Sequence, residues 1–171
     1  IWRLQNDVRV DVHDRTNVRS LTSDQIGGPV DLVVADLSFI SLSLVLPALA
    51  DCVEPDGDLL PMVKPQFQVG KDRVGAGGVV RDPALRIEAV AEVASDAAVL
   101  GLETRGVVAS PLPGPAGNVE YFIWLHKPAD VPGGMSAAAD KVGDRSAPVS
   151  AQPVGPEIMA MIVAAVEAGP R

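Results

Sequence analysis

Three charged residues, Asp36, Lys64 and Glu120, have side chains that could act together in catalysis. A lysine near a reacting hydroxyl group can orient it, stabilise the oxyanion that develops there, or accept its proton when the pKa of the amine is lowered. Carboxylates beside the lysine hold it in place and favour its protonated form. The alternative is that Asp36 and Glu120 cap loops while Lys64 is solvated. The pattern of strands decides whether these residues can meet.

Two short apolar runs place the first two of these residues. Val30–Ala35 and Asp58–Val63 each follow a turn signal and are predicted to be strands, the first buried on both faces. Asp36 and Lys64 come directly after them. Because sites in parallel α/β sheets form at the carboxyl ends of the strands, the two side chains are expected at one edge.

Glu120 stands near the beginning of the last predicted strand, Val119–Leu125. The strand before it is predicted over Glu103–Ala109, and the loop between them, Ser110–Asn118, is so dense in Pro and Gly that no helix fits there. Without a helical crossover the two strands should pair antiparallel. The beginning of the last strand then lies at the same edge as Asp36 and Lys64, so all three charged residues converge.

The remaining elements complete an α/β pattern. The strongest helix signal runs from Pro83 to Leu100, with Asp82 as its cap and Gly101 at its end. Three further elements are expected: a strand over Val8–Val12, a helix over Ser43–Cys52 and a short terminal helix over Glu157–Glu167 that packs on the same domain.

This alternation predicts a mainly parallel sheet closed by a hairpin that adds one antiparallel strand at its edge. It matches the second half of a doubly wound fold, so we expect the fold to be incomplete at its N-terminus. The fold should occupy residues 1–127, followed by a flexible linker rich in Pro, Gly and Ala over residues 128–156 and by the terminal helix within residues 157–171.

Composition limits the function. The 171 residues are 47% hydrophobic and carry a net charge of −8, which excludes a small basic RNA-binding module, because phosphate contacts are made by Lys and Arg. A single cysteine, Cys52, excludes an internal disulfide framework and a Cys-only metal cluster. The longest apolar run, Phe39–Ala50, is too short to span a bilayer and no signal peptide opens the chain, which favours a cytoplasmic protein. The first residue is Ile1 rather than Met, which suggests that the natural protein begins upstream.

Four longer strings carry a resemblance to a known family. They are Asp-Arg-Thr-Asn-Val-Arg (14–19), Val-Ala-Asp-Leu-Ser-Phe-Ile-Ser-Leu (34–42), Val-Lys-Pro-Gln-Phe (63–67) and Ser-Pro-Leu-Pro-Gly-Pro-Ala-Gly-Asn-Val-Glu-Tyr (110–121). In order and spacing, from Trp2 to Lys127, they resemble the TlyA family, which consists of S-adenosylmethionine-dependent 2′-O-ribose methyltransferases of ribosomal RNA, often labelled hemolysin-like. Several long motifs in register are far more specific than one short pattern.

The resemblance implies a Rossmann-like fold related to the FtsJ-type ribose methyltransferases, with a Lys-Asp-Lys-Glu tetrad. In that tetrad Asp36 matches the aspartate, Lys64 the second lysine and Glu120 the glutamate. Lys64 would orient and activate a ribose 2′-hydroxyl, and ribosomal RNA or a ribosomal subunit would be the partner. The residues implied to border S-adenosylmethionine are Thr16, Asn17, Asp36 and Leu37.

The chain departs from the family in two respects. The first lysine of the tetrad and the glycine-rich cofactor loop would both precede Trp2, and the family's S4-like RNA-binding domain is absent. We therefore expect the isolated chain to bind cofactor poorly and to be an inactive, incomplete enzyme. In addition, Gln68 stands where the family usually has glutamate, a position outside the tetrad.

The loop Val69–Arg81 carries Lys71, Arg73, Arg81 and a run of glycines. It could be a mobile loop that grips RNA phosphates, or an ordinary long surface loop. It matches neither the P-loop nor the Gly-x-Gly-x-x-Gly pattern. Its three basic residues, together with Asn118, form the candidate substrate-binding set.

Other functions stay open at this point. A non-catalytic remnant that binds RNA or the ribosome needs no cofactor, and a membrane-active hemolysin is disfavoured by the lack of a spanning segment and of a basic amphipathic helix. His13 and His126 have no second His or Cys at ligand spacing, so no metal site is predicted. The modified nucleotide and the oligomeric state are not determined by the sequence.

Overall fold

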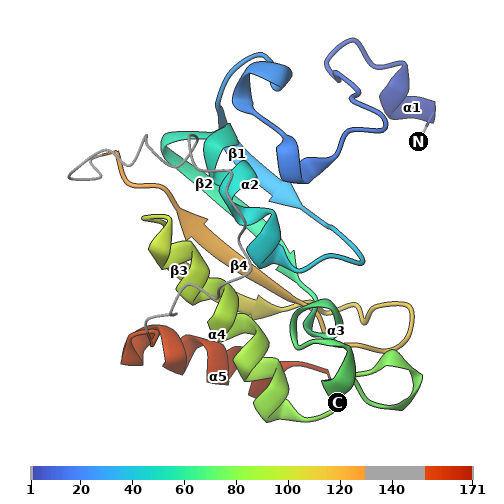
Figure 1. The fold of residues 1–171 in the computed structure, drawn as a ribbon, viewed down its shortest axis with the longest axis vertical. Helices are drawn as coiled ribbons and strands as arrows, with labels where there is room; N and C mark the ends of the chain where they lie inside the picture. Colours follow the sequence, from blue (N-terminus) through green and yellow to red (C-terminus); the bar gives the residue numbers. More distant parts are fainter. Residues whose placement is uncertain (1, 130–152, 171) are drawn as a thin grey trace.

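The computed structural model describes residues 2–129 and 153–170, whose main feature is a mixed four-stranded sheet (Figure 1). Its strands are β1 (Val30–Ala35), β2 (Val53–Val63), β3 (Glu103–Ala109) and β4 (Tyr121–His126), in the order β1-β2-β4-β3. β1 and β2 are parallel, and β4 pairs antiparallel with both β2 and β3. Three strands therefore run in one direction and β4 in the other.

The sequence predicted that the antiparallel strand lies at the edge of the sheet, and this prediction is wrong. β4 lies between β2 and β3, and β3 is the edge strand. The reason is packing: Tyr121, Ile123 and Leu125 of β4 are fully buried, whereas β3 offers a less apolar series of side chains. The expected juxtaposition is nevertheless confirmed, since Val63 at the end of β2 pairs with Tyr121 at the beginning of β4.

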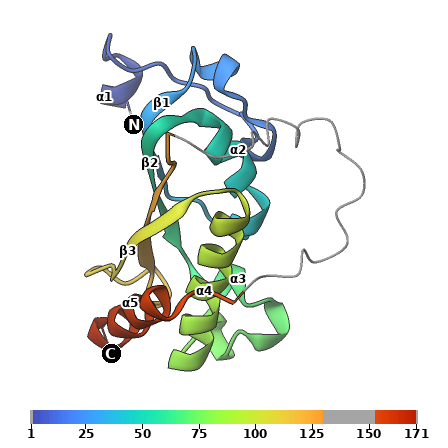
Figure 2. The same ribbon diagram turned by 90° about the vertical axis from the view of Figure 1, so that its left-hand side faces the viewer.

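Two of the three longer helices cover one face of the sheet, and the third lies beside the edge strand β3 (Figure 2). α2 (Leu46–Cys52) connects β1 to β2, α4 (Pro83–Val99) connects β2 to β3, and α5 (Pro156–Ala168) packs against β3 and α4. The predicted capping of α4 is confirmed, because Asp82 accepts a hydrogen bond from the Ala84 amide at 2.9 Å. The predicted terminal helix is also confirmed: α5 buries Ile162, Ala165 and Val166 in the shared core.

The other face of the sheet is open in the described part of the chain. Val34 of β1 is 68% exposed, and Leu32, Val108 and Trp124 on the same face are also exposed. The prediction that β1 is buried on both faces is therefore wrong. The physical reason is that β1 is an edge strand here and that the helices lie on the opposite face.

The N-terminal segment differs from the prediction as well. A short helix α1 (Trp2–Gln5) opens the described chain, and residues 8–12 form no strand; Val8 is fully exposed. Alternating residues become a strand only when another strand offers its backbone, and among residues 2–129 and 153–170 none lies beside this segment. Two short 3₁₀ helices follow, η1 (Val18–Ser20) and η2 (Ser23–Ile26).

Short helical segments shape the two loops that follow β1 and β2. The predicted helix over Ser43–Cys52 begins later, because η3 (Leu42–Leu44) precedes α2 and Pro47 is confined to the first turn of α2. After β2 come α3 (Pro65–Gln68), η4 (Lys71–Arg73) and η5 (Ala76–Gly78). Most of the predicted linker over residues 128–156 lies outside the described residues.

Candidate active site at the carboxyl edge of the sheet

Lys64 lies at the end of β2 and begins α3, which places its side chain beside the end of β1. Its Nζ atom lies 2.5 Å from Asp36 Oδ1 and donates a hydrogen bond to Ser38 Oγ at 3.1 Å. The Lys64 side chain is only 10% exposed, whereas that of Asp36 is 69% exposed. A largely buried lysine side chain is thus held by a carboxylate that faces solvent, at the edge where parallel strands end.

Glu120 belongs to the same edge but is held differently. It is buried, and its Oε1 atom accepts a hydrogen bond from Gln66 Nε2 at 3.4 Å. The ion pair that Lys64 makes in the described structure is with Asp36, so the lysine is not clamped directly between two carboxylates. Glu120 reaches α3 through Gln66 instead. Gly114 closes over this carboxylate, because a Cβ atom there would lie 2.7 Å from Glu120 Oε1.

A hollow of about 380 Å³ opens beside these residues. Phe39 stands at its rim, 90% exposed and with φ at +65°, a conformation that residues other than glycine rarely adopt. Its ring centroid lies 5.1 Å from that of Phe67. The hollow is lined by Phe39, Gln66, Phe67, Lys71, Val74 and Gly78. The exposed Phe39 ring, packed against half-buried Phe67, is suited to hold a flat ring near the Lys64 amine.

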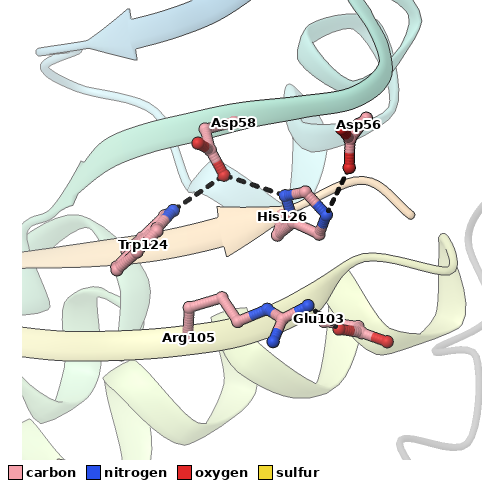
Figure 3. A network of polar contacts seen from close by, with 6 residues as sticks. All are labelled: Asp56, Asp58, Glu103, Arg105, Trp124 and His126. Carbon is pink, nitrogen blue, oxygen red and sulfur yellow. Dashed lines mark hydrogen bonds and ion pairs between the residues drawn. The ribbon is translucent and has the colours of Figure 1, made fainter. Parts of the chain in front are cut away.

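A polar network at the opposite edge of the sheet holds β2 and β4 in register (Figure 3). Asp58 Oδ1 accepts a hydrogen bond from Trp124 Nε1 at 2.8 Å and lies 3.0 Å from His126 Nδ1. The Trp124 bond lowers the pKa of Asp58 below its ordinary value of 3.8; His126 and Arg105 act in the same direction, and burial opposes them. This register places the end of β2 opposite Glu120.

Comparison with known proteins decides the family. The FtsJ-like methyltransferase family matches residues 1–127. The chain belongs to it. Over 129 residues the chain is 62% identical to the 16S/23S rRNA (cytidine-2′-O)-methyltransferase TlyA of Mycobacterium tuberculosis, an alignment that covers 75% of this chain and 48% of that protein. The chain thus spans about half the length of the curated relatives it matches.

Two solved structures share the fold of this chain. A hemolysin-named protein from Lactococcus lactis superposes with a TM-score of 0.72 at 35% identity, over 76% of this chain and 62% of that one. A hemolysin-named protein from Streptococcus thermophilus superposes with a TM-score of 0.75 at 29% identity, over 98% of this chain and 54% of that one. Within residues 2–129 and 153–170, no helix is both long enough and apolar enough to cross a bilayer.

The basic residues predicted for substrate binding are not gathered at the candidate site. Lys71 lines the hollow beside Phe39. Arg73 forms a bidentate ion pair with Glu88 of α4, which lowers the pKa of Glu88. The Arg81 guanidinium donates to the Ala76 carbonyl at 3.3 Å within its own loop. Of the three, only Lys71 lines the hollow.

Asn118 is buried and turned toward the protein. Its Oδ1 atom accepts a hydrogen bond from the Val80 amide at 2.9 Å, and its Nδ2 atom donates to the Gly78 carbonyl at 2.8 Å. Both ends of the amide therefore anchor the glycine-rich loop to the beginning of β4. Because Gly78 lines the hollow, the hydrogen bond from Asn118 helps to fix the wall of the hollow.

The residues implied to border the cofactor lie on two segments. Leu37 follows Asp36 and packs against the core. Asn17 caps η1 by accepting a hydrogen bond from the Arg19 amide at 3.1 Å, with Thr16 exposed beside it, and η1 contacts α2. Among the described residues, no side-chain hydrogen bond joins Asn17 to Asp36.

The side chains that could bind a metal ion make other contacts or are buried. In the described part of the chain no three His, Cys, Asp or Glu side chains are arranged to hold a metal ion. His126 lies in the network at the far edge, and His13 pairs with Asp11. Cys52 is buried, and burial raises the pKa of its thiol.

Sequence reasoning missed Phe39, Phe67 and Gln66 as residues of the site. All three lie within the strings that carry the family resemblance, and Gln66 and Phe67 stand two and three positions after Lys64. Their position within these strings could have marked them as candidate site residues. Only the packing of the loops that follow β1 and β2 shows that the side chain of Phe39 is exposed.

Proposed function

We propose that this chain is the catalytic part of an S-adenosylmethionine-dependent methyltransferase that modifies a ribose 2′-hydroxyl of ribosomal RNA. The observation that carries the proposal is the largely buried Lys64 side chain, whose amine is held by Asp36 and Ser38 at the carboxyl edge of the sheet. The substrate class comes from the rRNA ribose-methylating relative at 62% identity. Because ribosomal subunits are cytoplasmic, we place the protein in the cytoplasm.

Lys64 has the hydrogen-bonding capacity that the reaction needs. A lysine ammonium has three N–H donors. Asp36 and Ser38 each lie within bonding distance of Nζ, which leaves a third donor for the substrate oxygen. A positive charge fixed at that point stabilises the oxyanion that develops when the hydroxyl becomes a nucleophile. Glu120, held by Gln66, adds negative charge to the same edge and keeps α3 in place.

The end of β1 fits a nucleoside cofactor. Asp36 is exposed although it holds Lys64, so its carboxylate is accessible to polar groups of a ligand, and half-buried Leu37 offers an apolar neighbour. Ligands of open α/β sheets bind beyond the carboxyl ends of the strands, where these residues lie. When bound, S-adenosylmethionine would supply an electrophilic methyl group; Asp36 and Leu37, with Thr16 and Asn17, are the residues that we propose to border it.

The hollow beside Lys64 fits the substrate nucleotide. Phe39 presents an aromatic face on which a nucleobase can stack, which orders RNA without requiring a particular base. Lys71 supplies a cation on the wall of the hollow, where a phosphate group would be favoured. A stacked base would bring its ribose toward the Lys64 amine.

The test is methyl transfer by the full-length protein. Purified ribosomal subunits are incubated with the protein and S-adenosylmethionine carrying a labelled methyl group, and the labelled RNA is then hydrolysed with alkali. A 2′-O-methyl group blocks cleavage at its own nucleotide, because the 2′-hydroxyl is the nucleophile of that hydrolysis. Label recovered in an alkali-resistant dinucleotide supports the proposal.

Other outcomes of this assay contradict the proposal. Ribosome binding without transferred label would favour a non-catalytic RNA-binding protein. Label on a base instead of a ribose would assign a different reaction. A parallel measurement of dye leakage from liposomes addresses the membrane activity that the hemolysin names suggest.

A further inference from the structure

Gln68, the last residue of α3, is a buried polar residue that joins the two loops of the site. Its Oε1 atom accepts hydrogen bonds from Ser41 Oγ at 3.1 Å and from the Leu42 amide at 3.2 Å. Its Nε2 atom donates to Ser43 Oγ at 2.8 Å. One side chain after β2 thus binds three consecutive residues after β1, at the beginning of η3.

The bonds of Gln68 hold the C-terminal end of the segment 36–43, and Lys64 holds its N-terminal end. Lys64, at the beginning of α3, contacts Asp36 and Ser38, and Gln68, at the end of α3, contacts residues 41–43. Between the two points lies Phe39 with its positive φ. Such a backbone conformation costs energy and persists only where the surrounding structure imposes it. The segment 36–43 is therefore clamped by both ends of one short helix.

We propose that Gln68 is a positioning residue for methyl transfer, which fixes the segment 36–43 so that Asp36, Ser38 and Lys64 keep their geometry. The inference rests on the proposed function of the Lys64 site. Gln68 itself does not touch the substrate; it acts through the segment that carries the partners of Lys64. Small displacements of a catalytic group have large effects on rate, so loss of the clamp is expected to lower turnover more than substrate binding.

The neighbour of Gln68 on α4 explains why an amide suits this position. Burial raises the pKa of Glu92, and a hydrogen bond from Gln68 opposes that rise. An amide can accept from the segment 41–43 and donate toward Glu92 with the same side chain. A carboxylate at position 68 would keep the acceptor but would place a second negative charge against Glu92.

The experiment measures kcat and KM for RNA with the full-length protein and its Gln68→Leu variant. We expect kcat to fall roughly 10- to 100-fold while KM for RNA changes little. The matched control is Gln25→Leu, which removes a glutamine that accepts from the Thr22 amide in η2, before β1 and away from the site. A kcat for Gln68→Leu equal to that of the control would overturn the inference.

A second pair of variants tests the positioning role of Gln68 even if Gln68→Leu does not fold. Gln68→Glu keeps the acceptor and adds a charge beside Glu92, so we expect kcat to fall. The double variant Gln68→Glu/Glu92→Gln exchanges amide and carboxylate, and we expect it to recover most of the lost turnover. A double variant as slow as Gln68→Glu would contradict the role assigned to the amide.

The outcome for the wild-type protein separates this inference from the proposed function. A wild-type protein that transfers no methyl group to ribose overturns both. An active wild-type protein with Gln68 variants that match the control overturns the positioning role alone and leaves the function standing.

Discussion

Lys64 and Asp36 close the carboxyl edge of the sheet, with 2.5 Å between Lys64 Nζ and Asp36 Oδ1. The two residues lie at the ends of adjacent parallel strands, so the register of β1 and β2 alone brings their backbones together. Ser38 then takes a second N–H of the amine. The Asp36 carboxylate is exposed and the Lys64 side chain is largely buried. The lysine charge is therefore fixed at a point where it can stabilise a hydroxyl oxygen that attacks an electrophile.

Removal of the amine tests this assignment most directly. We expect Lys64→Ala to lower kcat roughly 100- to 1,000-fold, the usual effect of deleting a group that stabilises a developing oxyanion. The fold should persist, because the lysine lies at the rim of the core, and circular dichroism would check this. Methyl transfer is measured as label incorporated into ribosomal RNA by the full-length protein.

Lys127 is the matched control for this substitution. Its Nζ atom donates to the carbonyl oxygens of Ala50 at 2.9 Å and of Val53 at 2.6 Å, at the opposite edge of the sheet. Lys127→Ala removes a bonded lysine without touching the site, so it should lower stability and leave kcat near that of the wild type. Equal losses of activity in both variants would sink the catalytic assignment of Lys64.

Phe39 is expected to contribute to RNA binding through its exposed ring. Because stacking of a base on an aromatic ring contributes about 1–3 kcal/mol, Phe39→Ala should raise the KM for RNA about 5- to 150-fold. The measurement is steady-state methylation at varied RNA concentration. Val99 is an exposed apolar residue at the far end of α4, and Val99→Ala should leave KM unchanged. A Phe39→Ala variant with the wild-type KM would show that the ring takes no part in binding.

Asn118 should matter for stability. Its replacement by Leu leaves the buried Val80 amide without its partner and removes the hydrogen bond to the Gly78 carbonyl. An unsatisfied buried group costs about 1–3 kcal/mol, so we expect the free energy of unfolding to fall by about that amount. Denaturant titration measures it. The exposed Asn6, which donates to the Trp2 carbonyl, is the control, and Asn6→Leu should change the free energy of unfolding much less.

The network around Asp58 predicts a pH dependence of stability. The pKa of Asp58 is lowered in the folded state, chiefly by the hydrogen bond from Trp124. Its contribution to stability is therefore complete above its unfolded pKa near 4 and is lost as the pH falls through the lower folded value. We expect the free energy of unfolding of Asp58→Asn to decline less than that of the wild type between neutral and strongly acidic pH.

Asp56→Asn provides the comparison for the Asp58 variant. The Asp56 carboxylate lies 3.5 Å from His126 Nε2 and is 81% exposed, so its replacement should change the pH dependence less. Urea titrations of both variants at a series of pH values measure the effect. Identical curves for Asp58→Asn and the wild type would contradict the assigned stabilisation.

Much of the architecture follows from local patterns. Asp82, Pro83 and the apolar spacing of the following residues predict α4, and the structure has it over Pro83–Val99. The Pro- and Gly-rich loop before β4 predicts an antiparallel pair, and the observed register confirms it. These signals are local because caps, turns and periodicity act within a few residues of one another.

Patterns that need a neighbour were less reliable. The alternation of Val8–Val12 resembles a strand, yet no strand in the described part of the chain offers it a partner. The apolar residues of β1 indicate burial on both faces, yet Val34 is exposed because the described helices cover only the other face. The position of Arg73 in a loop with other basic residues suggested contact with RNA phosphates, and the structure shows it in an ion pair with Glu88 of α4.

The sequence by itself determined the strand ends at which Asp36 and Lys64 stand, the position of Glu120 at the beginning of an antiparallel strand, and the family. Only the tertiary structure decided that Lys64 bonds to Asp36 and Ser38, that Glu120 bonds to Gln66, and that Phe39 is exposed. The physical reason is that strand ends follow from local periodicity. Burial and hydrogen bonds between distant residues, in contrast, depend on which loops the packed core brings into contact.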